Sequence, residues 1–186
     1  GENSNFPIKE NEDTSRPLSF YAATKKSNEI LAYSYSNIFK IPCTGLRFFT
    51  VYGPWGRPDM ALFLFTKAIL AGKPIDVYNH GKMVRDFTYI ENVIEANLKA
   101  CQASSDVAGE AFNIAYGGRE YLIDVYRSLT KALGKEIDPI FGPDRKGDIK
   151  HSNADISKAK KMLGYDPSWS FERGIEAAIE WYRENL

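Results

Sequence analysis

The spacing of apolar and polar positions along the chain alternates between helical and extended types. Residues 21–39, "YAATKKSNEILAYSYSNIF", contain helix formers and no Gly or Pro, which predicts a helix with Ser19 as its N-cap and an end near Phe39. Residues 43–53, "CTGLRFFTVYG", are rich in β-branched and aromatic side chains and end in Gly-Pro, which predicts a strand. The first third of the chain therefore indicates a mixed α/β protein.

The same alternation continues to the end of the chain, without an internal repeat or a low-complexity tract. Gly72 closes one further predicted helix, and Asp155 and Ser170 are placed to cap the last two. Further helices are predicted at 61–72, 91–104, 121–134, 156–165 and 170–185. Extended segments are predicted at 75–81, 84–90, 109–118 and 136–142, and loops at 1–18, 53–60 and 143–155.

The overall charge argues against a polyanionic partner. The net charge is zero and the isoelectric point is about 6.9, so nucleic acid is not an expected partner. No apolar run approaches the roughly 18 residues that span a membrane, and the polar first residues do not resemble a signal peptide, so a cytoplasmic protein without a membrane partner is expected.

The cysteines and histidines indicate neither a disulfide framework nor a metal centre. Cys43 and Cys101 lie in separate apolar runs, and we expect two reduced, buried thiols, with a disulfide as the less favoured alternative. His80 and His151 have no Cys or carboxylate cluster at ligand spacing, so no metal site is predicted.

One Tyr-x-x-x-Lys stretch stands out as candidate chemistry. Tyr21 and Lys25 lie at the start of the first predicted helix, where residues four apart share a face. The spacing alone carries little information, because "YNHGK" at 78–82 has it too. That copy contains Asn79 and Gly81, which are poor helix formers, so its Tyr and Lys need not face the same way.

A feature usual in chains of this pattern is missing. No G-x-G-x-x-G turn follows a first strand, and the first predicted strand begins only near Cys43. We therefore expect this chain to be the C-terminal portion of a longer protein.

Four stretches occur in a fixed order along the chain: "YAATK" from Tyr21, "LRFFTVYGPWGRPDMA" at 46–61, "VRDFTYIENV" at 84–93 and "DRKGD" at 144–148. In this order they resemble the extended short-chain dehydrogenases that act on nucleotide sugars. The second is the most specific, and the chain is most similar to UDP-glucuronate 4-epimerases. The resemblance implies the C-terminal part of a Rossmann-type doubly wound domain plus a smaller α/β substrate-binding domain. Residues 1–58 would end the dinucleotide-binding domain, and 59–186 would mainly bind the nucleotide sugar, with some segments returning to the Rossmann sheet.

The resemblance assigns catalysis to Tyr21 and Lys25, with NAD as cofactor. A free tyrosine keeps its proton at neutral pH, and a cation one helical turn away favours the phenolate, which can remove a hydroxyl proton. In such an enzyme C4 of the sugar is oxidised to a ketone and reduced again from the other face. Tyr21, Lys25 and Phe48 are expected to contact NAD. The catalytic Ser or Thr of the family would lie upstream of Gly1.

The resemblance also implies a set of substrate contacts. Thr50 and Arg57 match the residues expected to hold the sugar carboxylate, which an arginine can bind with two parallel N–H bonds. Such a grip would slow the loss of CO₂ from the 4-keto uronic acid, which is a β-keto acid. The remaining expected contacts are Arg85 and Arg145 with the diphosphate, Asp148 with the ribose of UDP, and Tyr78 with the uracil or its ribose.

Several alternatives remain open. The segments "EAFNIAYGGREYLIDVYRSLTKALGK" and "GDIKHSNADISKAKKMLGY" are equally similar to UDP-N-acetylhexosamine 4-epimerases. A UDP-galactose type 4-epimerase, a UDP-glucuronate decarboxylase and a nucleotide-sugar 4,6-dehydratase are further candidates. In a different class, the chain is an inactive fragment that binds a UDP-sugar.

Two expectations concern association. The family implies a homodimer through the Tyr-Lys helix. The strand at 43–51 would belong to a sheet whose other strands are absent, so the isolated chain is expected to dimerise, aggregate or fail to fold.

Overall fold

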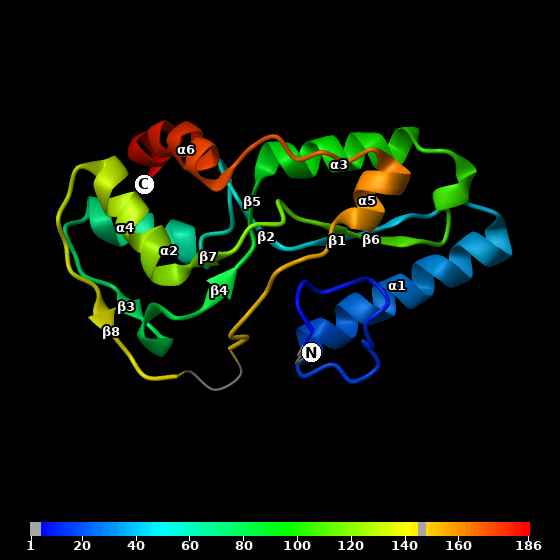
Figure 1. Ribbon diagram of the computed structural model, residues 1–186, viewed down its shortest axis with the longest axis horizontal. Helices are drawn as coiled ribbons and strands as arrows, with labels where there is room; N and C mark the ends of the chain where they lie inside the picture. Colours follow the sequence, from blue (N-terminus) through cyan, green and yellow to red (C-terminus); the bar gives the residue numbers. More distant parts are fainter. Residues whose placement is uncertain (1–4, 145–147) are drawn as a thin grey trace.

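The computed structural model describes residues 5–144 and 148–186, and it forms an α/β structure with two groups of helices (Figure 1). The α-helices are α1 (Phe20–Phe39), α2 (Ala61–Leu70), α3 (Ile90–Gln102), α4 (Leu122–Leu133), α5 (Ser157–Leu163) and α6 (Phe171–Asn185). The strands are β1 (Gly45–Phe48), β2 (Thr50–Tyr52), β3 (Asp76–Val77), β4 (Val84–Arg85), β5 (Phe87–Tyr89), β6 (Ala111–Ile114), β7 (Glu120–Tyr121) and β8 (Ile140–Phe141). Two 3-10 turns are η1 (Asn79–Gly81) and η2 (Ser105–Val107).

Strand pairing is mostly parallel and joins segments far apart in the chain. β1 pairs with β6, β2 with β5 and β3 with β8 in parallel, and β4 pairs with β7 in antiparallel orientation. Figure 1 shows α3 along one side of the β1–β6 pair and α1 along the other. Parallel strands with helices on both sides are the pattern of a doubly wound fold.

Two hydrophobic clusters hold the elements together. The first packs α2, α4 and α6 against β2 and β5 around residues such as Tyr52, Phe87 and Tyr126. The second lies between β6, α3 and α5 and includes Phe112 and Tyr165. Neither cluster contains a residue of α1. The cores therefore fix every α-helix except the one that carries Tyr21 and Lys25.

The helix predictions agree with the structure, and their caps explain why. Ser19 caps α1 by accepting a hydrogen bond from the Ala22 amide at 3.1 Å, and Ser170 caps α6 by accepting one from the Arg173 amide at 3.3 Å. Asp155 differs from the prediction. Ile156 is the N-cap of α5, and the Asp155 carboxylate accepts instead from the Ser157 amide at 2.9 Å.

The strand predictions were less accurate. The predicted strand at 43–53 is two strands, because the chain leaves β6 after Phe48 and joins β5 at Thr50. The extended segment at 84–90 is likewise divided between two sheets. The prediction of two buried thiols was wrong for Cys101, which is exposed, while Cys43 is half-buried and both thiols are free.

Candidate functional site

The Tyr21 and Lys25 side chains lie together on the first turns of α1. The Lys25 ammonium is 5.2 Å from the centroid of the Tyr21 ring. Tyr21 is 64% exposed and Lys25 is also exposed, so both can be reached by a ligand. A phenol beside a primary ammonium on a helix is a suitable pair for proton transfer from a hydroxyl group.

Arg57 lies within electrostatic reach of Tyr21. Its guanidinium forms two bonds to the Asp59 carboxylate, at 3.1 Å and 2.5 Å. These bonds and the Asp59 charge raise the pKa of Arg57, and the negative form of Tyr21 adds a smaller effect in the same direction. The loop after β2 therefore carries an exposed guanidinium whose direct partner is Asp59.

Thr50 and Arg57 line the same small pocket. Thr50 opens β2, and the pocket also contacts Met60, Phe87 and Tyr182. The loop between them is held by a bond from the Gly56 amide to the Gly53 carbonyl at 3.2 Å and by one from the Tyr182 hydroxyl to the same carbonyl at 3.3 Å. The two residues predicted to contact a sugar carboxylate thus come from the two ends of one braced loop.

Arg85 and Asp148 form a second group. Burial lowers the pKa of Arg85, and the nearby charge of Asp148 opposes that effect. The Arg85 guanidinium donates to the Val84 carbonyl at 3.0 Å and approaches the Met83 sulfur at 3.8 Å. Burial in this setting leaves Arg85 able to bind an anion strongly, because a half-buried cation is poorly compensated by water.

The remaining predicted residues are more dispersed. Tyr78 is the N-cap of η1, is 36% exposed, and lies against Gly142, where an added Cβ would be 3.2 Å from the tyrosine ring. Phe48 ends β1 and is 47% exposed. Because strand side chains alternate, Phe48 lies on the opposite face of β1 from Arg47, which bonds Glu29 of α1. Arg145 lies outside the described residues.

Sequence reasoning missed Asp86, a fully buried carboxylate next to Arg85. It accepts hydrogen bonds from the Gly117 and Ala154 amides, each at 3.1 Å, and from the Asn153 side chain at 3.4 Å. Burial raises its pKa to about 6, although the bonds from backbone N–H groups oppose the rise. The motif "VRDFTYI" includes Asp86, but nothing in this pattern distinguishes a buried carboxylate from an exposed one.

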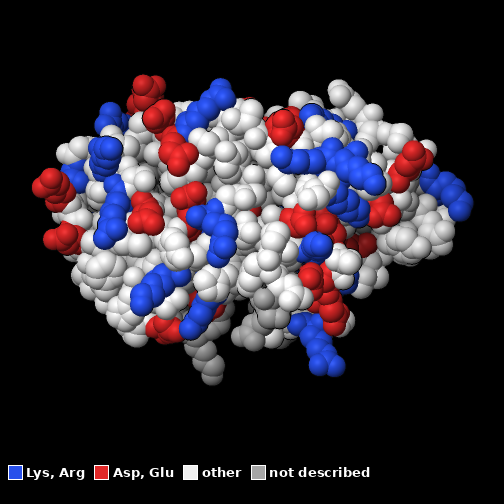
Figure 2. Space-filling view, viewed as in Figure 1, with Lys and Arg blue, Asp and Glu red and all other residues white. Residues whose placement is uncertain are grey.

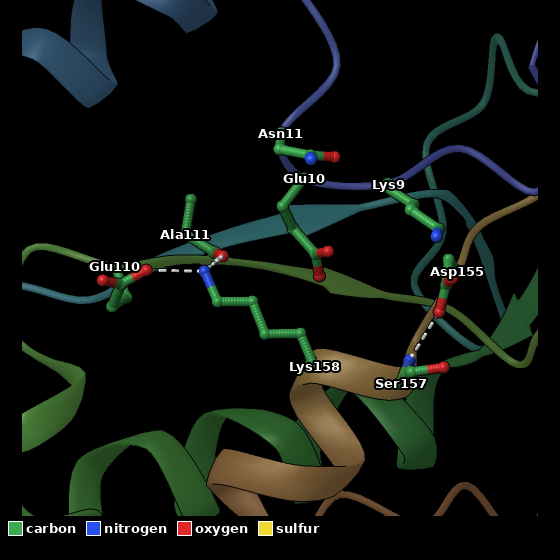
Figure 3. A pocket seen from close by; sticks show the side chains of 8 residues that line it. All are labelled: Lys9, Glu10, Asn11, Glu110, Ala111, Asp155, Ser157 and Lys158. Atoms are coloured by element: carbon green, nitrogen blue, oxygen red, sulfur yellow. Dashed lines mark hydrogen bonds and ion pairs between the residues drawn. The ribbon is translucent and has the colours of Figure 1, made fainter.

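A shallow hollow beside β6 contains none of the predicted site residues (Figure 3). Its charged side chains largely pair with each other: Lys158 contacts Glu110 at 2.6 Å, and Lys9 lies near Asp155 and lowers its pKa, after the larger effect of the Ser157 bonds. With two lysines against three carboxylates, the hollow has no strong excess of either charge, and we do not include it in the site.

Figure 2 shows acidic and basic side chains intermixed over the visible face, without a region of one sign. Within 5–144 and 148–186, no group of three or more His, Cys, Asp or Glu side chains is placed to hold a metal ion. Among those same residues, no helix has both the length and the apolar character to cross a bilayer.

Comparison with known proteins gives consistent matches. Residues 1–115 match the model of the NAD dependent epimerase/dehydratase family. The chain is 38% identical over 202 residues to a probable UDP-glucuronate 4-epimerase of Rhizobium meliloti, covering 100% of this chain and 59% of that protein.

Two solved structures show the same arrangement of elements. A UDP-glucose 4-epimerase of Thermotoga maritima, with UDP-glucose, superposes with a TM-score of 0.93 at 33% identity, covering 100% of this chain and 60% of that one. A UDP-glucuronic acid 4-epimerase of Bacillus cereus, with UDP-glucuronic acid and NAD, gives 0.86 at 37% identity, covering 92% and 55%. The chain thus spans between 55% and 60% of the length of these three proteins.

Proposed function

The chain belongs to the NAD-dependent epimerase/dehydratase family, and on that premise we propose that it is the C-terminal part of an enzyme that inverts C4 of UDP-glucuronate through a 4-keto intermediate. The fold is the α/β fold of the matched epimerase structures. The observation that carries the proposal is the Tyr21–Lys25 pair on α1, and the position of Thr50 and Arg57 in one small pocket supports it.

The polar groups of the Tyr21–Lys25 pair are of the kind that can bind a nicotinamide nucleotide. A phenol and an ammonium, both exposed on one helical face, can bond the hydroxyls of a ribose and leave the phenol free to reach a second ligand. NAD would supply the acceptance and return of a hydride at C4 of the sugar. Tyr21 would take the C4 hydroxyl proton and later return it, and the Lys25 charge would stabilise the phenolate in between. Phe48 remains a proposed ring contact at the end of β1.

In this proposal the nucleotide part of the substrate lies against the second group. Arg85 would bind the diphosphate, Asp148 the ribose hydroxyls, and Tyr78 the uracil or ribose. Arg145, outside the described residues, would complete the diphosphate contacts. These roles come from the resemblance, and the electrostatic proximity of Arg85 to Asp148 supports them.

The second candidate is a 4-epimerase for a neutral or N-acetylated UDP-sugar. The matched Thermotoga maritima structure is a UDP-glucose 4-epimerase, and it superposes at least as well as the glucuronic acid enzyme. In that case the only role of Arg57 would be its ion pair with Asp59. This pair lies on the surface, with both side chains about two-thirds exposed. Pairs of this type contribute little to stability, so they do not by themselves require an arginine.

The test uses the full-length protein that carries this chain, incubated with NAD and either UDP-glucuronate or UDP-N-acetylglucosamine, followed by chromatography of the products. UDP-galacturonate formed only from the first substrate supports the proposal. Conversion of the second substrate alone would give the function to the alternative, and no conversion of either would favour an inactive UDP-sugar-binding protein. The same assay on the 186-residue chain shows whether it turns over alone.

Arg57→Ala is expected to raise KM for UDP-glucuronate by about 10- to 100-fold, because a bidentate charge-assisted bond to the carboxylate would be lost. Initial rates over a range of substrate concentrations measure the change. Asp59→Asn should not raise KM, because it frees Arg57 from its present partner. The matched control is Arg127→Ala, which removes an arginine from a similarly exposed surface pair with Asp124. An unchanged KM for Arg57→Ala would exclude the carboxylate role.

The protein's location in the cytoplasm stays a prediction.

A homodimer through α1 is the expected assembly. Phe20, Leu31, Tyr35 and Ile38 share one face of α1 and are 93%, 57%, 56% and 65% exposed. Leu31→Glu in the full-length protein should shift the sedimentation coefficient from dimer to monomer. Ile94→Glu, on the exposed side of α3, is the control with the same change. A monomeric wild-type protein would contradict the prediction.

A further inference from the structure

The helix that carries the proposed catalytic pair is weakly packed. None of the residues of α1, all of which are described, is buried, and its large apolar side chains are mostly exposed. Among the described residues, the contacts that join α1 to the strands are therefore mainly polar.

A forked ion pair joins α1 to β1. The Arg47 guanidinium donates from Nε to one oxygen of the Glu29 carboxylate at 2.6 Å and from Nη2 to the other at 2.9 Å. Both side chains are about three-quarters covered, which limits screening by water. The bonds from Arg47 lower the pKa of Glu29, so the carboxylate stays charged at neutral pH.

Glu29 stands in line with the catalytic pair. Tyr21, Lys25 and Glu29 are spaced i, i+4 and i+8, so their side chains form one ridge along α1. Arg47 directly precedes the last residue of β1. Two parallel N–H bonds fix a direction as well as a distance, so this pair sets how the ridge faces the end of the strand.

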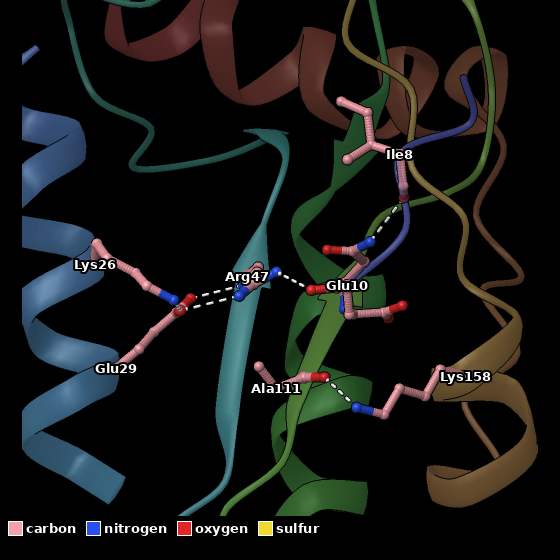
Figure 4. A network of polar contacts seen from close by, with 8 residues as sticks. Ile8, Glu10, Lys26, Glu29, Arg47, Ala111 and Lys158 are labelled. Carbon is pink, nitrogen blue, oxygen red and sulfur yellow. Dashed lines mark hydrogen bonds and ion pairs between the residues drawn. The ribbon is translucent and has the colours of Figure 1, made fainter. Parts of the chain in front are cut away.

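The pair continues into a longer polar network (Figure 4). Arg47 Nη1 donates to the Glu10 carbonyl at 3.0 Å, and the Glu10 carboxylate accepts from the Asn113 amide of β6 at 2.9 Å. The Asn113 side chain donates to the Ile8 carbonyl at 2.9 Å and to the Asp155 carbonyl at 3.3 Å.

At its far end this network reaches the second group of site residues. Residue 154 precedes Asp155, and its amide donates to the Asp86 carboxylate, which follows Arg85 in the chain. Hydrogen bonds, together with peptide bonds between adjacent residues, thus connect α1 with the segment proposed to bind the diphosphate.

From this geometry we propose that Glu29 and Arg47 are positioning residues, which hold the Tyr21–Lys25 ridge in register with the end of β1. The inference rests on the proposed function, because that function places a reacting substrate beside Tyr21 and Lys25. A displacement of about 1 Å at a reacting group can lower a rate by about 10²-fold, so a small rotation of α1 is sufficient to be seen in kcat.

The experiment compares Glu29→Ala with Glu110→Ala in the full-length protein. Glu110 is the matched control, because it too forms a 2.6 Å ion pair with partial exposure, but its partner is Lys158 of α5 and the pair does not join α1 to β1 (Figure 3). We expect Glu29→Ala to lower kcat by about 10- to 100-fold with KM within about twofold, and Glu110→Ala to change neither. Arg47→Lys keeps the charge without the fork and should fall between wild type and Glu29→Ala.

Hydrogen exchange provides a readout that does not depend on turnover. In Glu29→Ala, the amides of α1 should exchange faster while those of α4 stay unchanged. Equal exchange in α1 of wild type and variant would overturn the inference, and so would faster exchange with unchanged kcat. If the wild-type protein converts no UDP-sugar, the proposed function fails, and exchange alone then shows whether the pair holds α1.

Discussion

Tyr21→Phe in the full-length protein is expected to lower kcat for UDP-glucuronate by about 10²- to 10⁴-fold, with little change in KM. The substitution removes only the hydroxyl that would accept and return the C4 proton, while the ring and its contact with Lys25 remain. Product formation under saturating substrate measures the effect.

Tyr33→Phe is the matched control for this prediction. Tyr33 lies further along the same helix and is 65% exposed, against 64% for Tyr21, so the same atom is removed from a similarly exposed side chain outside the pair with Lys25. Its activity should equal that of the wild type. Similar losses in both variants would indicate damage to α1 in general, and no loss in either would remove Tyr21 from the mechanism.

Gly174→Ala is expected to reduce the free energy of unfolding by about 3 kcal/mol. A Cβ on Gly174 would lie 2.1 Å from the Tyr52 hydroxyl oxygen and 2.9 Å from Cβ of Tyr89. Tyr52 cannot easily move, because its ring is buried and its hydroxyl donates to the Phe171 carbonyl at 2.9 Å. The helix preference of Ala over Gly, at most about 1 kcal/mol, is too small to offset the overlap. Urea denaturation of the full-length protein measures the loss.

Two further variants test the cause of that loss. Gly45→Ala places a Cβ 3.5 Å from that of Ala111, an ordinary contact, and should change the unfolding free energy little. Combining Gly174→Ala with Tyr52→Phe removes the nearest clashing atom, so the double variant should be more stable than the sum of the two single changes predicts. Simple additivity would show that the clash does not involve the hydroxyl.

The helices were predictable because their signals are local. Ser19 and Ser170 mark helix starts within four residues of the groups they cap, and Gly134 ends α4 in the left-handed conformation that glycine permits. The division at Phe49 was not predictable, because a continuous β-branched and aromatic run has the same pattern whether it pairs with one strand or two.

The site residues show the same limit. Tyr21 and Lys25 are neighbours because they share a helix, and helical spacing is visible in the sequence. Glu29 and Arg47 are 18 residues apart, in different elements, and Asp86 receives amides from segments 31 and 68 residues away. Contacts of this kind depend on the tertiary fold, and neither composition nor periodicity contains them.

The bond from the Tyr52 hydroxyl to the Phe171 carbonyl spans 119 residues, and this separation has a consequence for synthesis. A ribosome adds about 5–20 residues per second, so Phe171 follows Tyr52 out of the ribosome roughly 6 to 24 s later. Until then the ring of Tyr52 lacks the helix that covers it, and the first hydrophobic cluster stays open on that side. Nascent chains that stop before α6 would expose this apolar surface, which is the kind of surface that chaperones and proteases recognise.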